Sequence, residues 1–245
     1  MKTINEYLEE NSIPSVPKHK LKHNSTNLNV YIYPKPLVED YLRLCALNDT
    51  WLGLDHSIRE RQESFELPRS FRNEGERLIF LSMGTLGSNN VELMSHLCKL
   101  LAKCKHKIIV SRGHSHEMYK LAENMWGEAY LPQLEVLPLV DLVIFHGGSN
   151  TLIESLYYAK PMIVMPLFGD QHDNAQRVVE MNVGIKLNAF TVEENELLNS
   201  IECLLEDTEM AIRLKKISNC MKESKSMDAL INRVEKIAKE PKIPN

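Results

Sequence analysis

From Arg77 onward, short aliphatic runs alternate with longer segments that repeat their apolar residues at helical spacing. The expected strands are Leu78–Leu81, Lys107–Val110, Leu142–Phe145, Met162–Met165 and Gly184–Leu187, and the expected helices are Val91–Lys103, Leu152–Ala159, Asn174–Asn182 and Glu193–Leu205. This alternation predicts an α/β fold in which crossover helices connect the strands of a parallel sheet. Two of the runs, Leu142–Phe145 and Met162–Met165, are apolar throughout, which indicates strands covered by helices on both faces of the sheet.

The two ends of the chain have a different character. Residues 1–76 are rich in Pro, Lys and His near their start and then show only short apolar runs, such as Val30–Tyr33, which Pro34 and Pro36 follow. We interpret Val30–Tyr33 as a short strand and the whole region as a connector or the remnant of another domain. The segment Thr208–Lys239 is expected to be a charged helix that packs one face on the main domain. Residues 240–245 are expected to form a tail.

Composition excludes several classes of partner and location. The chain has 245 residues, of which 43% are hydrophobic, and a net charge of −4, so nothing attracts it generally to nucleic acid or to anionic lipid. No segment approaches the roughly 20 apolar residues of a membrane span, and the first residues lack the apolar core of a signal peptide. Five cysteines without Cys-x-x-Cys spacing indicate a reducing compartment. We therefore expect a cytoplasmic protein and give little weight to the glycosylation sequons at Asn24 and Asn48.

Ligands of open α/β sheets bind at the carboxyl ends of the strands, so the loops there are the candidate site. The first loop, Ser82–Ser88, has the sequence SMGTLGS and includes Thr85. Its backbone amides could bind an anion before a helix, although a tight turn with a Ser or Asn cap explains the loop equally well. The sequence is neither G-x-G-x-x-G nor a Walker A motif, which argues against a dinucleotide-dependent dehydrogenase and an NTPase.

The second loop, His146–Thr151, is more specific because it combines two glycines with an imidazole, hydroxyls and an amide ahead of a helix. Such groups can donate hydrogen bonds to a diphosphate at the positive end of the helix. Glu154, one turn into that helix, accepts hydrogen bonds when ionised and so suits a diol such as ribose. The alternative is structural: Asn150 caps the helix and His146 is a hydrogen-bonded core histidine.

The third loop, Pro166–Asn174, contains Asp170 and Gln171 side by side. A carboxylate and an amide at adjacent positions can hold neighbouring sugar hydroxyls. The structural alternative is that Asp170 or Asp173 caps the following helix, and for Asp173 we prefer that interpretation.

Taken together, these loops resemble a known signature. The run from Tyr130 to Gln171 has an aromatic-x-Pro-Gln opening, a His-x-Gly-x-Asn core, a glutamate eight positions after the histidine and an acidic-Gln ending. It is similar to the donor-binding signature of the UDP-glycosyltransferase family, which includes glucuronosyltransferases, plant enzymes and bacterial macrolide glycosyltransferases. The soluble macrolide-type and arthropod members are the most similar, and the resemblance extends more loosely from about Leu28 to about Lys239.

The resemblance implies a GT-B fold of two facing Rossmann-like domains, of which residues 77–239 would be the C-terminal, donor-binding one. It also implies roles for individual residues. Tyr130 would stack on uracil, Gln133 would contact the nucleoside and Glu154 would hold the ribose. The diphosphate would be bound by Thr85, His146, Gly148, Ser149, Asn150 and Thr151. The transferred sugar would be bound by Asp170 and Gln171. Tyr130 stands where Trp or Phe is frequent and Ser149 where plant members have Trp, so the choice of donor stays open.

The same resemblance implies the reaction and its partners. The UDP-sugar is a co-substrate rather than a cofactor, no metal is required, and a hexosyl or glucuronosyl group passes to a small lipophilic hydroxylated acceptor with inversion. The family's catalytic base is a histidine of the N-terminal domain, so no residue of this chain is assigned as catalytic, and His19, His23 and His56 lack a supporting motif. We expect the chain to need an N-terminal acceptor domain, and we expect self-association or a partner that supplies that half. The alternative is a non-catalytic UDP-sugar-binding subunit or a truncated homologue completed by a partner chain.

Overall fold

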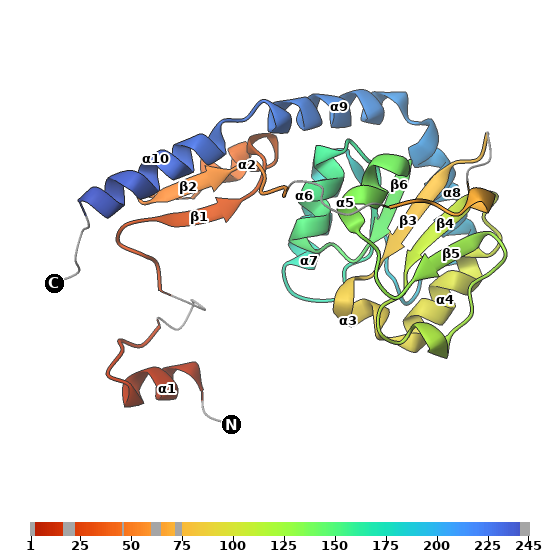
Figure 1. The fold of residues 1–245 in the computed structure, drawn as a ribbon, viewed down its shortest axis with the longest axis horizontal. Coiled ribbons are helices and arrows are strands. Elements are labelled where there is room, and N and C mark those ends of the chain that lie inside the picture. The colour runs from red at the N-terminus through yellow and green to blue at the C-terminus, as the bar shows by residue number, and fades with distance from the viewer. Residues whose placement is uncertain (1–2, 17–22, 46, 60–64, 72–74, 241–245) are drawn as a thin grey trace.

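The computed structural model describes residues 3–16, 23–45, 47–59, 65–71 and 75–240. Figure 1 shows a large sheet flanked by helices, beside a smaller unit in which segments from both ends of the chain meet. The elements in chain order are α1 (Ile4–Glu10), β1 (Asn29–Ile32), α2 (Lys35–Leu42), β2 (Trp51–Leu54), η1 (Arg69–Phe71), β3 (Leu78–Ser82), α3 (Gly84–Ser88), α4 (Val91–Leu101), β4 (Lys107–Ser111), η2 (His116–Met118), β5 (Met125–Glu128), α5 (Gln133–Val136), η3 (Leu137–Leu139), β6 (Leu142–Phe145), α6 (Ser149–Tyr157), β7 (Met162–Val164), α7 (Gln171–Glu180), β8 (Gly184–Lys186), α8 (Glu194–Glu206), α9 (Thr208–Lys222) and α10 (Ser226–Lys239).

The large sheet has six parallel strands in the order β5-β4-β3-β6-β7-β8. Helices α4 and α8 pack together on one face, while α6, α7 and α9 form the layer on the other. Strands β3, β4 and β5 follow one another toward one edge of the sheet, and strands β6, β7 and β8 follow one another toward the other edge. The strand order therefore reverses between β3 and β6. Ligand sites of open α/β sheets lie at this reversal. The expected α/β class, with a Rossmann-like parallel sheet covered on both faces, is confirmed.

The core follows from the apolar runs of the sequence. All four residues of β6 are fully buried, as are Ile79, Phe80 and Leu81 of β3. Burial of one such side chain contributes about 1.5–3 kcal/mol, which makes the central strands the most firmly held part of the molecule. The loops that leave these strands are therefore attached to a rigid base.

Several expected boundaries differ from the observed ones. Helix α6 begins at Ser149 rather than Leu152, and α7 begins at Gln171 rather than Asn174. The interpretation of Asp173 as a helix cap is wrong, because the N-cap of α7 is Asp170 and Asp173 lies within the first turn. Strand β5 was not predicted from the sequence. Its Gly127 lies so close to β4 that a Cβ atom there would stand 2.0 Å from the carbonyl oxygen of Val110.

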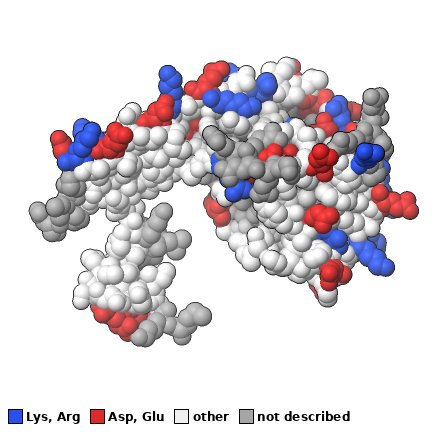
Figure 2. All heavy atoms as spheres, viewed as in Figure 1, with Lys and Arg blue, Asp and Glu red and all other residues white. Residues whose placement is uncertain are grey.

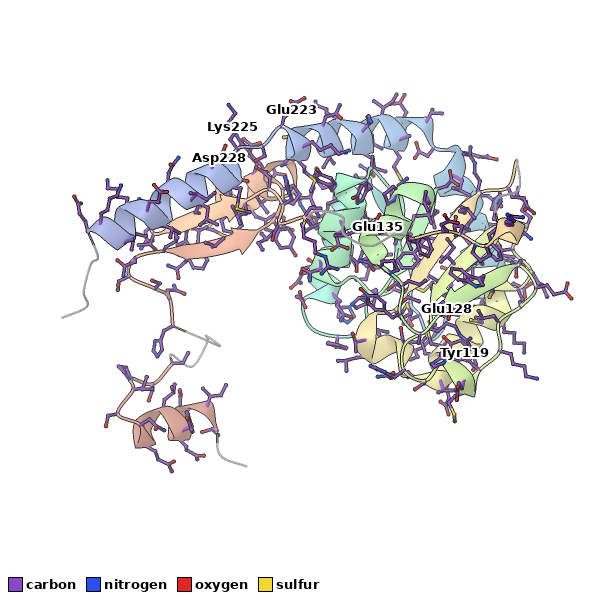
Figure 3. All side chains as sticks on the ribbon, viewed as in Figure 1. Tyr119, Glu128, Glu135, Glu223, Lys225 and Asp228 are labelled. Carbon is purple, nitrogen blue, oxygen red and sulfur yellow. The ribbon has the colours of Figure 1, made fainter. Side chains whose placement is uncertain are left out.

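The charged C-terminal segment, expected as one helix, forms α9 and α10. The break between the two helices is stabilised by hydrogen bonds to Asp55, directly after β2. The Ser224 hydroxyl donates to Asp55 Oδ2 over 2.6 Å, and the Asp55 amide donates to Ser226 Oγ over 3.1 Å. Helix α9 packs on α6, whereas α10 packs on β2. Figure 3 shows Glu223, Lys225 and Asp228 at this junction. Side chains of both charges cover the outer surface of α9 and α10 in Figure 2.

The smaller unit consists of β1, α2 and β2, with α10 against β2. Its two strands are parallel, and Val30 and Ile32 of β1 are each 38% exposed. The expected strand at Val30–Tyr33 is thus confirmed within a residue. Pro34 and Pro36 end it and also begin α2, where proline is favourable because the first turn of a helix needs no amide donor. The assignment of residues 1–76 to the remnant of another domain stays a prediction.

Arg177 of α7 joins the smaller unit to the large sheet. Its side chain is 10% exposed, its guanidinium donates to the carbonyl oxygen of Leu37, and it lies 3.3 Å from Asp40 and 4.9 Å from the centre of the Tyr41 ring. These contacts attach α2 to α7. None of the helices in the described ranges is both long and apolar enough to cross a membrane.

Candidate functional site

The three candidate loops meet at the carboxyl edge of the sheet. The first and second loops touch where Gly84 faces the ring of His146, and the second and third are joined by a 3.0 Å hydrogen bond from Ser149 Oγ to Asp170 Oδ2. The first and third approach at Gly87, where a Cβ atom would lie 2.8 Å from Leu167 Cδ1. Neighbouring parallel strands bring these loops together, because β3, β6 and β7 lie next to one another.

His146 lies between two glycines. A Cβ atom at Gly84 would come within 2.6 Å of its ring, and one at Gly148 within 2.5 Å of Nε2, so only residues without a side chain fit on either side. Burial lowers the pKa of His146 below its ordinary value of 6.5, while the Ser82 backbone and the Asp170 carboxylate oppose that shift. Nδ1 is buried and makes no well-formed hydrogen bond within the described residues. Because burial dominates and the pKa lies below 6.5, the imidazole is mostly neutral at pH 7.

Gln133, Thr151 and Glu154 form a second cluster. The amide nitrogen of Gln133 donates to Thr151 Oγ1 over 3.2 Å and to a carboxylate oxygen of Glu154. Burial raises the pKa of Glu154, and the hydrogen bond from Gln133 together with the charge of Arg59 lowers it in part. The two residues expected to contact the nucleoside and the ribose thus lie within hydrogen-bond reach of each other.

Asp170 belongs to a third cluster, with Ser149 and Asn174. The side-chain amide of Asn174 donates to the Gly147 carbonyl oxygen over 2.8 Å and to Ser149 Oγ over 3.2 Å, and Ser149 in turn donates to Asp170. Gln171 is only 4% exposed, and its amide oxygen accepts hydrogen bonds from the backbone amides of Leu167 and Phe168. Asp170 is thus the exposed member of the expected sugar-binding pair, while Gln171 shapes its loop from within.

The other expected site residues lie on the surface. Thr85 is exposed on the first turn of α3, Asn150 is exposed on the first turn of α6, and Tyr130 is 65% exposed after β5. An exposed ring is available to stack on a planar base. The N-cap of α6 is Gly148, whose lack of a side chain leaves the first amides of that helix without a side-chain cap. An anion is the expected complement of such a helix end.

Three residues of this region were not predicted from the sequence: Asn174, Tyr33 and Arg59. Asn174 is 2% exposed and also accepts a hydrogen bond from the Tyr33 hydroxyl, which ties the end of β1 to the second loop. Its position one helical turn after Asp170 and Gln171 was the available signal. Arg59 lines a cavity with Asn150 and Glu154 and has no signal in the sequence, because its position depends on how the connector folds back.

The histidines of the connector region lie elsewhere. His19 falls outside the described residues, and His23 contacts the Pro14 carbonyl oxygen at 2.7 Å. His56 packs on Tyr157, at the last residue of α6 and so at the far end of that helix from the second loop. In the part of the chain that the structure describes, no three His, Cys, Asp or Glu side chains are grouped to hold a metal ion. The expectation of a metal-independent site stays a prediction.

Comparison with known proteins identifies the family and the fold of this chain. Residues 13–236 match the family model described as UDP-glucoronosyl and UDP-glucosyl transferase. The chain is 27% identical over 195 residues to the uncharacterized UDP-glucosyltransferase YdhE of Bacillus subtilis. The matched region covers 78% of this chain and 49% of that protein. It is 26% identical over 204 residues to human UDP-glucuronosyltransferase 1A1, covering 81% of this chain and 38% of the relative.

Solved structures show the same fold. The glycosyltransferase of kitacinnamycin superposes with a TM-score of 0.76 at 22% identity, covering 94% of this chain and 60% of that one. The calicheamicin glycosyltransferase CalG4 superposes with a TM-score of 0.71 at 15% identity, covering 89% and 54%. The chain spans about half the length of the curated relatives it matches. Because the family model covers most of its residues, the chain belongs to the UDP-glucuronosyl and UDP-glucosyl transferase family, a family of hexosyltransferase enzymes with the GT-B fold.

Proposed function

We propose that this chain is the donor-binding half of an inverting UDP-dependent glycosyltransferase that passes a hexosyl or glucuronosyl group to a small lipophilic hydroxylated acceptor. The observation that carries the proposal is the pairing of Gln133 and Glu154 beside the start of α6, which no side chain caps. A carboxylate suited to a ribose diol and a helix end suited to phosphate thus lie one helical turn apart on the same element. The nucleoside would extend from Glu154 toward Tyr130.

In the proposed reaction the acceptor oxygen attacks the anomeric carbon of the sugar. The bond from that carbon to the diphosphate breaks, UDP leaves with the bonding electrons, and a base takes the proton of the acceptor hydroxyl. This chain's part is to bind the leaving group: the first amides of α6 and an N–H of His146 would stabilise the charge that develops on the diphosphate. Asp170 would orient the sugar through its hydroxyls.

The base and the acceptor pocket are proposed to come from an N-terminal acceptor domain. Within the described residues, His23 and His56 lie apart from the three loops, and the chain spans about half the length of its curated relatives. Both observations support a site that needs a second wall. All five cysteines are unpaired, which supports the proposal of a cytoplasmic location.

Isothermal titration calorimetry with UDP and UDP-glucose tests the donor site. We expect binding that is the same with and without a chelator, because the groups proposed to bind the diphosphate are amides, hydroxyls and one imidazole. Adenosine diphosphate is the matched control, since it offers the same diphosphate with a purine in place of uracil. A folded sample that binds no uridine nucleotide would overturn the proposal.

A non-catalytic UDP-sugar-binding subunit, or a truncated homologue completed by a partner chain, is the second candidate. It predicts the same binding, and what distinguishes it is transfer activity after an acceptor domain is supplied.

A further inference from the structure

A cavity of about 300 Å³ lies along α6, between that helix and the segment that follows β2, which is called the connector from here on. Its walls are Asn150, Ile153 and Glu154 on α6, Ile32 at the end of β1, and Ser57–Arg59 of the connector. Asn150 and Glu154 are one helical turn apart, about 6 Å along the axis, so both face the same opening. Asn150, one of the residues proposed to bind the diphosphate, and Glu154, proposed to bind the ribose, therefore border one cavity.

The candidate loops are poor in positive charge for a site that would hold a diphosphate. None of the segments Ser82–Ser88, His146–Thr151 and Pro166–Asn174 contains a lysine or an arginine. His146 is neutral at pH 7 because burial lowers its pKa, and Glu154 and Asp170 add negative charge on either side of the start of α6. Two carboxylates and a diphosphate repel one another, so a cation from outside these loops would strengthen donor binding.

Among the described residues, two arginines of the large sheet and its helices, Arg112 and Arg177, are engaged elsewhere. Arg112, after β4, donates to the carbonyl oxygens of His116 and Tyr119 and packs on the ring of Tyr119. Arg177 is occupied by the Leu37 carbonyl and by the acidic side chains of Asp40 and Glu180. Of the described residues that line the cavity, only Arg59 carries a positive charge.

We propose that Arg59 is the cation that neutralises the diphosphate of the bound donor, reaching it from the connector across the cavity on α6. The inference rests on the proposed function. A guanidinium can donate two parallel hydrogen bonds to phosphate oxygens, so Arg59 would add charge and geometry that the amides of α6 do not supply. Because the connector joins the smaller unit to the large sheet, donor binding would also hold that segment against α6.

The test compares wild-type protein with the variants Arg59→Gln and Arg59→Lys. Arg43→Gln is the matched control, because the Arg43 side chain, at the C-cap of α2, is 75% exposed and lies outside the cavity. Affinity is measured by calorimetry for UDP and by ligand-observed NMR for uridine, which has no phosphate. The measurements are repeated at low and high ionic strength, and thermal melts verify folding.

We expect Arg59→Gln to weaken UDP binding about 10-fold to 100-fold and to leave uridine binding unchanged. Arg59→Lys should recover part of the affinity. High ionic strength should reduce the preference for UDP over uridine more in the wild type than in Arg59→Gln. Normal UDP binding by Arg59→Gln would overturn the inference alone, as would an equal loss for UDP and uridine. Failure of the wild type to bind UDP would overturn the proposed function and the inference with it.

Discussion

Glu154 is the residue whose chemistry most directly separates a binding role from a structural one. Its folded-state pKa is raised by burial, so its ionised form costs stability, and this cost appears as the pH rises through the folded pKa. A structural carboxylate would be expected to show the opposite shift. The fold thus holds the Glu154 side chain in an environment that disfavours its ionised form, which is typical of a functional group.

Replacing Glu154 by Gln should therefore weaken UDP binding while leaving the fold intact. The loss of charged hydrogen bonds to ribose should cost about 1.5–3 kcal/mol of binding free energy, and the melting temperature at pH 7 should stay the same or rise. Calorimetry measures the binding free energy, and thermal denaturation measures the melting temperature. Glu196→Gln, an exposed change on α8, is the control. Loss of folding with normal affinity in the folded fraction would show that Glu154 is structural.

His146 should make donor binding depend on pH. The free protein holds it neutral at pH 7, whereas a bound diphosphate favours the protonated ring and raises its pKa. Binding of UDP-glucose should therefore take up protons near neutral pH and become tighter as the pH falls, until it levels off below the pKa of the free protein. Calorimetry in two buffers of different protonation enthalpy measures the uptake. The variant His146→Asn should abolish it; the same uptake in that variant would assign the proton to another group.

At the scale of elements, the site depends on loops that follow adjacent strands and approach one another without intervening side chains. Gly84 shows this best: its φ is +68°, and a Cβ atom would meet the His146 ring. Gly75 has a φ of +92° but has no atom within 4 Å of an added Cβ, so it shares the backbone constraint without the contact.

Gly75→Ala should cost about 1–2 kcal/mol of folding free energy through its left-handed backbone alone. Gly84→Ala should cost more, and it should also weaken UDP binding because the His146 ring has to move. Urea denaturation and calorimetry of the two variants measure the difference. Equal costs in both variants, with unchanged UDP affinity in Gly84→Ala, would show that the contact between the first two loops is not needed for binding.

At the scale of the whole molecule, we expect the chain alone to bind the donor without transferring its sugar. Transfer needs a positioned acceptor, a base within hydrogen-bond reach of its hydroxyl, and a closed site that excludes water. The described residues place donor-binding groups on one wall of such a site. Leu86 beside Thr85 is 67% exposed and Phe168 beside Asp170 is 49% exposed, as expected of a wall that faces a second domain.

Mass spectrometry of products tests this expectation. The assay uses UDP-glucose and UDP-glucuronate with phenols and lipophilic alcohols, with and without a co-expressed N-terminal half of a related enzyme. Glycoside should form only when the second half is present. Efficient transfer by the lone chain would contradict the expectation and would return attention to His19, His23 and His56.

The sequence by itself determined the fold class, the positions of most strands along the chain and the three loops. These are local properties: buried parallel strands need continuous apolar runs, as in Leu142–Phe145, and the loop after such a strand is read directly from the residues that follow it. Strand β5 escaped prediction because Met125–Glu128 is short and includes Gly127, which only the close approach of Val110 explains. Both Asp170 and Asp173 were possible caps of α7 from the sequence, and Asp173 was preferred because Asp170 was predicted to bind the sugar; capping and sugar binding favour the same residue types.

Only the tertiary structure decided how the loops and the connector combine. The contacts of His146 with two glycines, of Asn174 with Gly147 and Tyr33, and of Arg59 with the cavity on α6 join segments up to 141 positions apart. No local pattern encodes such pairs, since they depend on the reversal of strand order between β3 and β6 and on the path of the connector. The sequence could therefore indicate which loops are candidates to bind the donor. The folded chain decides which side chains remain exposed to reach it, because packing against distant residues determines burial, charge state and orientation.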